Sequence, residues 1–201
     1  MALHQIQTGS RSPGETRLRI LTATRSLLAQ KGRRGTTTRE IADLAGVNEA
    51  TVFRHFGHKD ALIEECVKHY CSTVELQELL ASLDGDLELD LRRIAMALVQ
   101  RMETVRDLIV MSLAEEETQG SVGDAAWRAP TAIKKIIADY MAKRIANGEL
   151  SGNPLFLARF FMGMTFSYVM GRKRFPEEYA AEPRQVVEFQ VGMFLNGARK
   201  I

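Results

Sequence analysis

Two helix-start signals lie close together in residues 36–62, and they restrict the fold more than any other feature of this chain. Thr37 and Glu40 have the spacing of a capping box, in which each side chain accepts a hydrogen bond from the other residue's backbone N–H. Gly46 stands where a left-handed residue commonly ends a helix, and Asn48 is a strong N-cap for a second helix. We therefore predict two short helices joined by a tight turn.

The predicted short helices span residues 37–45 and 48–56, and neither is long enough to be stable alone in water. A preceding helix, which Ser12 opens as N-cap and Gly32 ends, supplies the supporting surface. Two short helices held in this way form a helix-turn-helix, whose second helix enters the major groove of DNA. A tight corner in an ordinary helical bundle has the same pattern. The predicted anchors toward the first helix are Ile41, Ala42, Leu44, Val47, Val52 and Phe56.

Charge is distributed unevenly along the 201 residues. Residues 1–60 carry ten Lys and Arg against five Asp and Glu, a net charge of +5, whereas residues 61–201 carry seventeen against twenty, a net charge of −3. A basic segment joined to a mildly acidic body favours a polyanion as the partner of the basic end, although a solvated basic helix has the same composition. The helix-turn-helix pattern inside the basic segment favours DNA.

Helical periodicity continues through the rest of the chain, and the alternation typical of strands is nearly absent. A stripe of apolar residues predicts one long helix from about residue 59 until residues 83–90 break it. Further helices are predicted at 91–102, 105–117, 133–145, 154–172 and 183–199, with a loop at 118–124. We therefore predict an all-α protein of about nine helices.

One further pattern agrees in register with a known family. It consists of "TTREIA" at 37–42, "AGVN" at 45–48, "ATVFRHF" at 50–56 and "KDAL" at 59–62. This pattern resembles the N-terminal signature of TetR-family transcriptional regulators, over about residues 13–65. The rest of the chain resembles the family only in length and helical pattern.

The resemblance implies an organisation in two parts, a helix-turn-helix DNA-binding domain at residues 1–58 and an effector-binding and dimerisation domain at residues 59–201. It implies a homodimeric repressor that binds a palindromic operator in double-stranded DNA and is released by a small-molecule effector. Two other classes stay open, a helical small-molecule-binding protein that does not bind DNA and a helical enzyme. No nucleophile, phosphate loop or paired-carboxylate motif supports the enzyme.

The resemblance also assigns roles within the helix-turn-helix. Thr38 would bind a phosphate through its hydroxyl and backbone N–H, and Arg39 would reach either a phosphate or a guanine edge. Candidates for base contacts are Asn48, Glu49, Ala50 and Arg54. Candidates for contacts to the DNA backbone are Thr51, His55 and Lys59. Taken singly, Thr51 is also a candidate cap partner and His55 a candidate solvated histidine.

Three positions depart from the usual family pattern. Phe53 stands where the family usually has a tyrosine whose hydroxyl bonds a phosphate, so we expect Phe53 to pack on a sugar or a thymine methyl group instead. Ala50 replaces a frequent Gly or Pro. His58 replaces a frequent Ser or Asn, and its imidazole nitrogen can still cap a helix weakly. These departures leave the predicted fold unchanged and alter the expected contacts to DNA.

Methionine and aromatic residues are spread over the middle helices, where the family keeps its effector pocket. Such residues more often belong to a plain core than to a ligand site. No buried charge stands out as a counter-ion, so an apolar or aromatic effector is expected. The candidate pocket residues are Met96, Met111, Trp127, Tyr140, Met141, Met164 and Tyr168.

Small residues recur along the predicted helix at 154–172 and leave a groove that lets another helix approach closely. The groove could serve packing inside the monomer. In TetR-like proteins the last two helices of each subunit pair into a four-helix bundle, which favours a dimer interface here. The candidate interface residues are Phe160, Gly163, Ser167, Gly171, Phe189 and Phe194.

The remaining features exclude several classes of protein. Cys66 and Cys71 make no disulfide framework and fit a reduced cytoplasmic protein. Cys66 and His69 share a helix face but Cys71 points elsewhere, so no metal site and no cofactor is expected. No signal peptide is recognisable, and no apolar run approaches the roughly 20 residues that span a bilayer. We expect no membrane partner.

Overall fold

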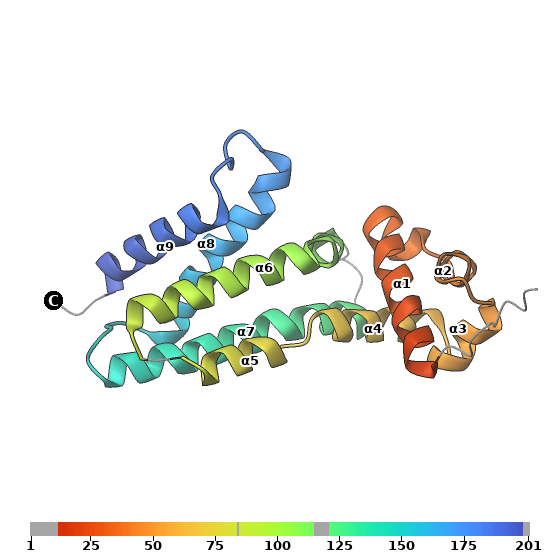
Figure 1. The fold of residues 1–201 in the computed structure, drawn as a ribbon, viewed down its shortest axis with the longest axis horizontal. Coiled ribbons are helices and arrows are strands. Elements are labelled where there is room, and N and C mark those ends of the chain that lie inside the picture. The colour runs from red at the N-terminus through yellow and green to blue at the C-terminus, as the bar shows by residue number, and fades with distance from the viewer. Residues whose placement is uncertain (1–11, 84, 115–120, 199–201) are drawn as a thin grey trace, which may run out of the picture. The chain divides into compact units, whose positions relative to one another are not determined.

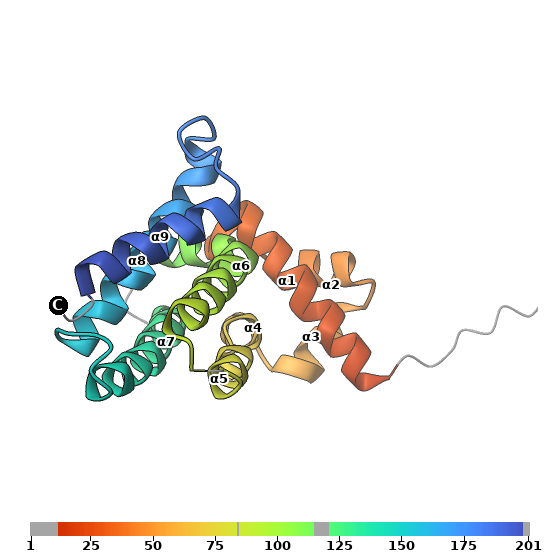
Figure 2. The same cartoon turned by 60° about the vertical axis from the view of Figure 1, so that its left-hand side comes forward.

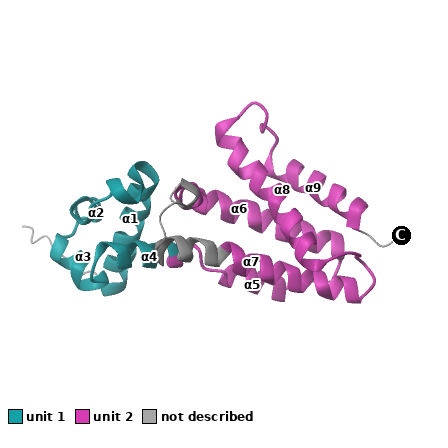
Figure 3. Cartoon of the chain, turned by 180° about the vertical axis from the view of Figure 1, so that it is seen from behind, with its two compact units in different colours: residues 1–67 teal, residues 68–201 magenta. Residues whose placement is uncertain are grey.

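The computed structural model describes residues 12–83, 85–114 and 121–198, without the side chains of 112–114 and 121–129. Within these residues the chain forms nine α-helices and no strand, which confirms the predicted all-α class. The chain divides into two compact units, Met1–Val67 and Lys68–Ile201, shown in teal and magenta in Figure 3. The division falls inside helix α4, Lys59–Tyr70.

Unit 1 contains α1 (Pro13–Gly35), α2 (Thr38–Ala45), α3 (Glu49–Phe56) and most of α4 (Figure 1). Both hydrogen bonds of the Thr37–Glu40 capping box are present, each at 3.2 Å between the backbone nitrogen and the side-chain oxygen. Gly46 has φ 63° and ψ 44°, a left-handed conformation that suits glycine. The helix-start and helix-stop signals of this segment are therefore confirmed.

The short helices of unit 1 are held by burial against α1 and α4. Ile20 and Leu28 of α1, Ile41 of α2, Val52 of α3 and Leu62 of α4 are each at most 1% exposed. Such complete burial of branched side chains is worth about 1.5–3 kcal/mol per residue, which is the support that two eight-residue helices need.

One predicted anchor is wrong. Leu44 is 56% exposed, because the inward stripe of α2 is formed by Ile41, Ala42 and Ala45, and Leu44 lies off that stripe. An apolar residue at an i, i+3 spacing therefore does not always belong to the buried face.

Unit 2 contains α5 (Val74–Ala81), α6 (Leu87–Ala114), α7 (Ser121–Ala146), α8 (Pro154–Arg174) and α9 (Pro183–Ala198). Helix α6 is the central element, because it contacts α5, α7, α8 and α9 (Figures 1 and 2). Its residues Leu91, Ile94 and Leu98 are fully buried in one apolar core with Phe161 and Met141.

Three of the predicted helix boundaries are wrong. The long helix expected from residue 59 divides at residues 71–73 into α4 and α5, because Ser72 and Thr73 have low helix propensity and compete for backbone hydrogen bonds. The two helices expected at 91–102 and 105–117 form the single helix α6, in which the Thr104 hydroxyl donates to the Gln100 carbonyl at 2.9 Å. Residues 121–124 belong to α7 and not to a loop.

A buried polar cluster ties the start of α6 to the end of α7. Asp90 is fully buried and accepts hydrogen bonds from Arg144 and, at 3.0 Å, from the Tyr140 hydroxyl. Arg144 also donates to the Gly85 carbonyl at 2.8 Å and pairs with Glu149 at 3.0 Å. A carboxylate in a first turn and a guanidinium in a last turn both complement the helix dipoles.

The pKa values of Tyr140 and Arg144 in this cluster are both raised above their usual values. Burial raises the pKa of the Tyr140 phenol above its usual value, and the Asp90 charge adds to that effect. Burial alone would lower the pKa of Arg144, but hydrogen bonds to Glu149 and Tyr140 outweigh burial and raise the pKa. The phenol therefore stays protonated and the guanidinium stays charged wherever the protein is folded.

We predict that Asp90→Asn lowers the free energy of unfolding by about 3 kcal/mol, because it removes the fully buried counter-charge of Arg144 and leaves the guanidinium with only the partly exposed Glu149. The double change Asp90→Leu with Arg144→Met should cost less than Asp90→Asn alone, since it removes both charges. Glu103→Gln is the control, because the exposed ion pair of Glu103 with Arg172 should contribute about 1 kcal/mol or less. Urea unfolding measures all three, and equal losses for Asp90→Asn and Glu103→Gln would contradict the assignment.

Candidate functional site

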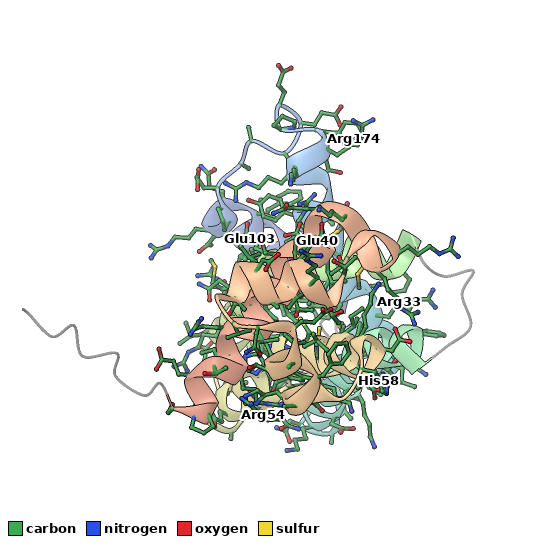
Figure 4. The ribbon with its side chains drawn as sticks, turned by 90° about the vertical axis from the view of Figure 1, so that its right-hand side faces the viewer. Arg33, Glu40, Arg54, His58, Glu103 and Arg174 are labelled. Atoms are coloured by element: carbon green, nitrogen blue, oxygen red, sulfur yellow. The ribbon has the colours of Figure 1, made fainter. Side chains whose placement is uncertain are left out.

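The candidate nucleic-acid surface is the face of α2 and α3 that is not buried against α1. Arg39, Asn48, Ala50 and Arg54 are exposed, and Phe53 is 45% exposed although it is aromatic. Thr38, Glu49, His55 and Lys59 are partly exposed, whereas Thr51 is buried. Figure 4 looks onto unit 1 from this side and labels Arg54 and His58. Nine of the ten residues predicted for DNA therefore lie at least partly at the surface.

Two hydroxyls of the predicted set are engaged inside the protein. The Thr38 hydroxyl donates to the Glu49 carboxylate at 2.5 Å, which links the start of α2 to the start of α3. The Asn48 side-chain oxygen accepts from the Thr51 backbone N–H at 2.8 Å and from the Thr51 hydroxyl at 2.7 Å. Asn48 therefore acts as the predicted N-cap, and Thr51 is its local cap partner.

Six of the described basic residues of unit 1 fall into two groups according to their ion pairs. One group forms ion pairs inside the unit, Arg17 with Glu65 at 2.6 Å, Lys31 with Glu40 at 2.5 Å and Arg33 with Asp60 at 3.0 Å.

In the other group, Arg39, Arg54 and Lys59 have no ion-pair partner among the described residues. All three side chains are at least partly exposed, on α2, α3 and the first turn of α4. Part of the excess positive charge predicted from the sequence is therefore unpaired at the surface of these helices.

Arg17 of α1 contacts α3 on the side opposite the exposed face, and it was not among the residues predicted for the site. Its guanidinium lies 4.4 Å from the centre of the Phe56 ring, donates to the His55 carbonyl at 3.4 Å and pairs with Glu65 of α4. Arg19 acts in a similar way on α2, since it donates to the carbonyls of Ala45 and Gly46. An arginine near the inward stripe of an amphipathic helix is the signal that could have indicated this role.

The turn into α4 is capped by histidine. His58 Nδ1 accepts from the Ala61 backbone N–H at 3.2 Å, as predicted for the residue that replaces the usual Ser or Asn. This cap fixes the first turn of α4, where Lys59 lies. In the capping box of α2, hydrogen bonds from the Lys31 ammonium and the Thr37 hydroxyl hold the pKa of Glu40 below its usual value. They therefore favour the carboxylate form of Glu40, which accepts the capping hydrogen bond.

A cavity of about 530 Å³ lies in unit 2, between α5, α6 and the last turn of α4. A volume of this size suits a small organic ligand. A second, more open hollow of about 560 Å³ lies beside it, lined by residues of α5, α6 and α9. Leu79, Ala97 and Gln100 line both.

The residues predicted for an effector pocket do not line the cavity. Met111, Tyr140, Met141 and Tyr168 are buried in the core, with Tyr140 bonded to Asp90 and the Tyr168 hydroxyl to the Ala181 carbonyl at 2.8 Å. Met164 packs against the core, Met96 lines only the second hollow, and the Trp127 side chain lies outside the described residues. Met111, Tyr140, Met141 and Tyr168 therefore pack as core residues in this structure, and the predicted effector pocket stays a prediction.

An exposed apolar face covers one side of α8 and α9. Phe156 and Phe160 of α8 are 61% and 69% exposed, and Phe189 and Met193 of α9 are 70% and 53% exposed. Gly163 and Ser167 continue the α8 stripe and are exposed as well. Contiguous exposed aromatic residues of this kind mark an interaction surface.

Two residues predicted for that face are used inside the chain. Phe194 is 7% exposed and packs edge-on against Phe161, with ring centres 5.0 Å apart. A Cβ at Gly171 would lie 2.4 Å from the Tyr179 ring, so this glycine allows Tyr179 to approach α8. We therefore leave Phe194 and Gly171 out of the apolar face.

The described residues contain neither a metal-binding cluster nor a membrane-spanning helix. No group of three or more His, Cys, Asp and Glu residues among them is placed to hold a metal ion. Cys66 is buried, and its thiol donates to the Leu21 carbonyl with a separation of 3.5 Å. None of the described helices combines the length and the apolar character needed to cross a bilayer.

Comparisons with known proteins agree with this architecture. The family model for bacterial regulatory proteins of the tetR family matches residues 20–66. YvkB of Bacillus subtilis (strain 168), described as an uncharacterized HTH-type transcriptional regulator, is 32% identical over 184 residues, which are 90% of this chain and 96% of YvkB. KstR2 of Rhodococcus jostii (strain RHA1), an HTH-type transcriptional repressor, is 33% identical over 77 residues, 37% of each chain.

Solved structures share the fold at lower sequence identity. NalD of Pseudomonas aeruginosa, the secondary repressor of the MexAB-OprM multidrug efflux pump, has a TM-score of 0.69 and 20% identity, covering 94% of this chain and 99% of NalD. GusR of Salmonella enterica has a TM-score of 0.71 and 21% identity, covering 93% of this chain and 98% of GusR.

A helix-turn-helix with free positive charge, followed by a helical second unit, defines a DNA-binding transcriptional regulator. The similarity to YvkB extends over nearly the whole of both chains, so this chain belongs to the TetR family of bacterial regulatory proteins. The predicted family, fold class and regulatory function are thereby confirmed. These relatives are described as transcriptional regulators.

We predict that Arg17→Ala lowers the free energy of unfolding of unit 1 by about 1–2 kcal/mol, because it removes a partly exposed ion pair and the contact with the Phe56 ring. The backbone amides of α3 should exchange with deuterium faster in this variant. Lys31→Ala removes an ion pair without an aromatic contact and is the matched control. If both variants lost the same stability and left α3 exchange unchanged, Arg17 would not position α3.

Proposed function

We propose that this chain acts in the bacterial cytoplasm as a homodimeric repressor that binds a palindromic operator and leaves it when a small molecule binds unit 2. The observation that carries the proposal is the free charge of Arg39, Arg54 and Lys59 on the uncovered face of a helix-turn-helix. KstR2 and NalD, to which the chain is similar, are both described as repressors.

The proposed contacts divide between phosphates and bases. Phosphates would meet the N-terminus of α2, where the backbone N–H of Thr38 and the helix dipole attract an anion, and the Lys59 ammonium. Arg39 and Arg54 would each grip a guanine through O6 and N7, and the exposed ring of Phe53 would lie against a thymine methyl group or a sugar. His55 would contact the backbone, with Asn48, Glu49 and Ala50 beside the bases.

The exposed apolar face of α8 and α9 supports the homodimer. Phe156, Phe160, Phe189 and Met193 would pack against the same residues of a second copy, with Gly163 and Ser167 allowing the helices to approach closely. A dimer presents two recognition helices, which must enter successive major grooves about 34–36 Å apart or at a multiple of that distance.

Release by an effector would be a shift between two populations of the dimer. In one form of the dimer the recognition helices have the spacing that DNA requires, and in the other they do not. A ligand that binds the second form more tightly than the first shifts the dimer off DNA to the extent of that difference in affinity. Helix α4 is the natural connection, because it begins at Lys59 and ends at Tyr70, which lines the cavity.

We predict that Arg39→Ala and Arg54→Ala each weaken binding to the preferred operator by about 1–3 kcal/mol and weaken binding to random DNA less, because each arginine reads a base. Lys59→Ala should weaken binding to all sequences alike and lower the salt slope by about one unit. The operator comes from selection on random oligonucleotides, and fluorescence anisotropy measures affinity over a range of salt concentrations.

Lys31→Ala is the control for these variants, since Lys31 is basic, lies in unit 1 and is paired with Glu40. It should bind the operator almost as tightly as the natural chain. Equal losses on operator and random DNA would make both arginines phosphate contacts, and failure of the natural chain to enrich any sequence would overturn the proposed function.

We predict that Gly163→Leu raises the dissociation constant of the dimer without destabilising the monomer. A Cβ at Gly163 meets no atom within 4 Å inside the chain, so the added side chain obstructs only a partner. Lys135→Leu, which adds the same side chain at an exposed position of α7, is the control. Analytical ultracentrifugation at micromolar concentration decides, and a natural chain that sediments as a monomer would refute the dimer.

A further inference from the structure

We propose that the cavity between α5 and α6 binds a small organic acid, whose carboxylate pairs with Arg101 and whose apolar body lies against Leu76, Leu79 and Val105. This inference rests on the proposed function in taking the cavity as the effector site. It goes further in naming the chemical class of the effector, an amphipathic monoanion.

The cavity is formed by matching faces of two helices. On the α5 side the cavity is lined by residues three or four positions apart, which are Ser72, Glu75, Leu76 and Leu79. The α6 residues that line it have the same helical spacing and are Ala97, Gln100, Arg101, Thr104 and Val105. Leu76 and Val105 are 3% and 6% exposed, so the part of the cavity wall that they form is apolar and largely shielded from solvent. Polar groups and apolar groups are therefore both available to one ligand.

Among the residues that line this cavity, Arg101 is the one with a buried polar atom that the described part of the chain leaves unsatisfied. Its Nη2 nitrogen is buried and has no hydrogen-bond partner among the described residues. No ion pair to Arg101 occurs within that part of the chain either, although arginines nearby on α6 such as Arg92 are paired with carboxylates. A buried donor without a partner costs free energy, and a guanidinium is matched best by the two oxygens of a carboxylate.

The other charges around the cavity do not replace that partner. Glu75 is the one carboxylate among the lining residues described, and it is exposed and makes no ion pair with Arg101. His69, on α4, packs edge-on against Tyr70 with ring centres 4.9 Å apart. Because Arg101 is the one permanent cation of this lining, a single negative charge balances it, which favours a carboxylate over a phosphate dianion.

The size and lining of the cavity determine the size and the apolar character of the ligand beyond its carboxylate. A volume of about 530 Å³ accommodates an acid with an aliphatic chain or an aromatic ring. The apolar body keeps the apolar or aromatic character expected of the effector, and the acid group supplies the charge that Arg101 lacks.

The test compares octanoate, decanoate and 4-phenylbutyrate with their primary amides, which have nearly the same shape without the charge. Calorimetry and thermal shift measure binding to the natural dimer. At least one acid should bind about 10- to 100-fold tighter than its amide, the range expected of a charge-assisted pair. Arg101→Gln should remove this preference, and Arg101→Lys should restore part of it.

Arg93→Gln is the matched control, because it removes the same charge from α6 outside this cavity. Circular dichroism establishes that each variant is folded. The inference is overturned if none of the acids binds, if acids and amides bind equally well, or if Arg101→Gln keeps the preference for the acid.

Operator binding separates this inference from the proposed function. Acids that bind through Arg101 to a dimer that selects no DNA sequence would support the cavity assignment and overturn the regulator mechanism. Operator release by the amides as well as the acids, unchanged in Arg101→Gln, would support the mechanism and overturn the assignment of Arg101.

Discussion

Helices of eight residues do not persist alone in water, and both helices of the DNA-binding motif have that length. Their existence depends on burial of Ile41, Ala42 and Val52 against α1, which converts an unstable pair into a rigid surface. Arg17 adds an electrostatic contact from the same side, through Phe56 and Glu65. The direction in which Arg39 and Arg54 project is thus fixed by residues that never approach DNA.

Sequence reasoning succeeded where the determining physics is local. The caps at Thr37, Asn48 and His58 are formed by hydrogen bonds between residues three positions apart, so they were predictable from the sequence. The glycine at position 46 was predictable too, because the turn after α2 requires a left-handed backbone conformation there. The predictions failed where the decision is made by distant packing. Leu44 belongs to an apolar pattern but not to the buried face. The break at Ser72 and Thr73 has a local cause instead, which the continuous apolar stripe concealed.

The same distinction explains why the cavity was not anticipated. Tyr140 and Tyr168 are of a residue type that often contacts ligands, yet each is buried and has a hydrogen-bond partner inside the chain. An arginine on a helix such as Arg101 is usually solvated, yet its Nη2 nitrogen is buried and has no hydrogen-bond partner among the described residues. Whether a polar side chain is satisfied depends on residues far along the chain, and no one-dimensional pattern contains that information. The proposal for Arg101 therefore rests on an unsatisfied polar group and not on residue type.

The hydrogen bonds at the start of α3 have a consequence for the base composition of the operator. Asn48 Oδ1 already accepts two hydrogen bonds from Thr51, and Glu49 Oε1 accepts one from Thr38, so the start of α3 presents few vacant acceptors. Adenine N6 and cytosine N4 are donors in the major groove and have few complements on such a surface. Guanine offers two acceptors to an arginine, and thymine offers a methyl group to Phe53 and Ala50. For the proposed operator we accordingly expect a half-site rich in guanine and thymine on the strand that this face contacts.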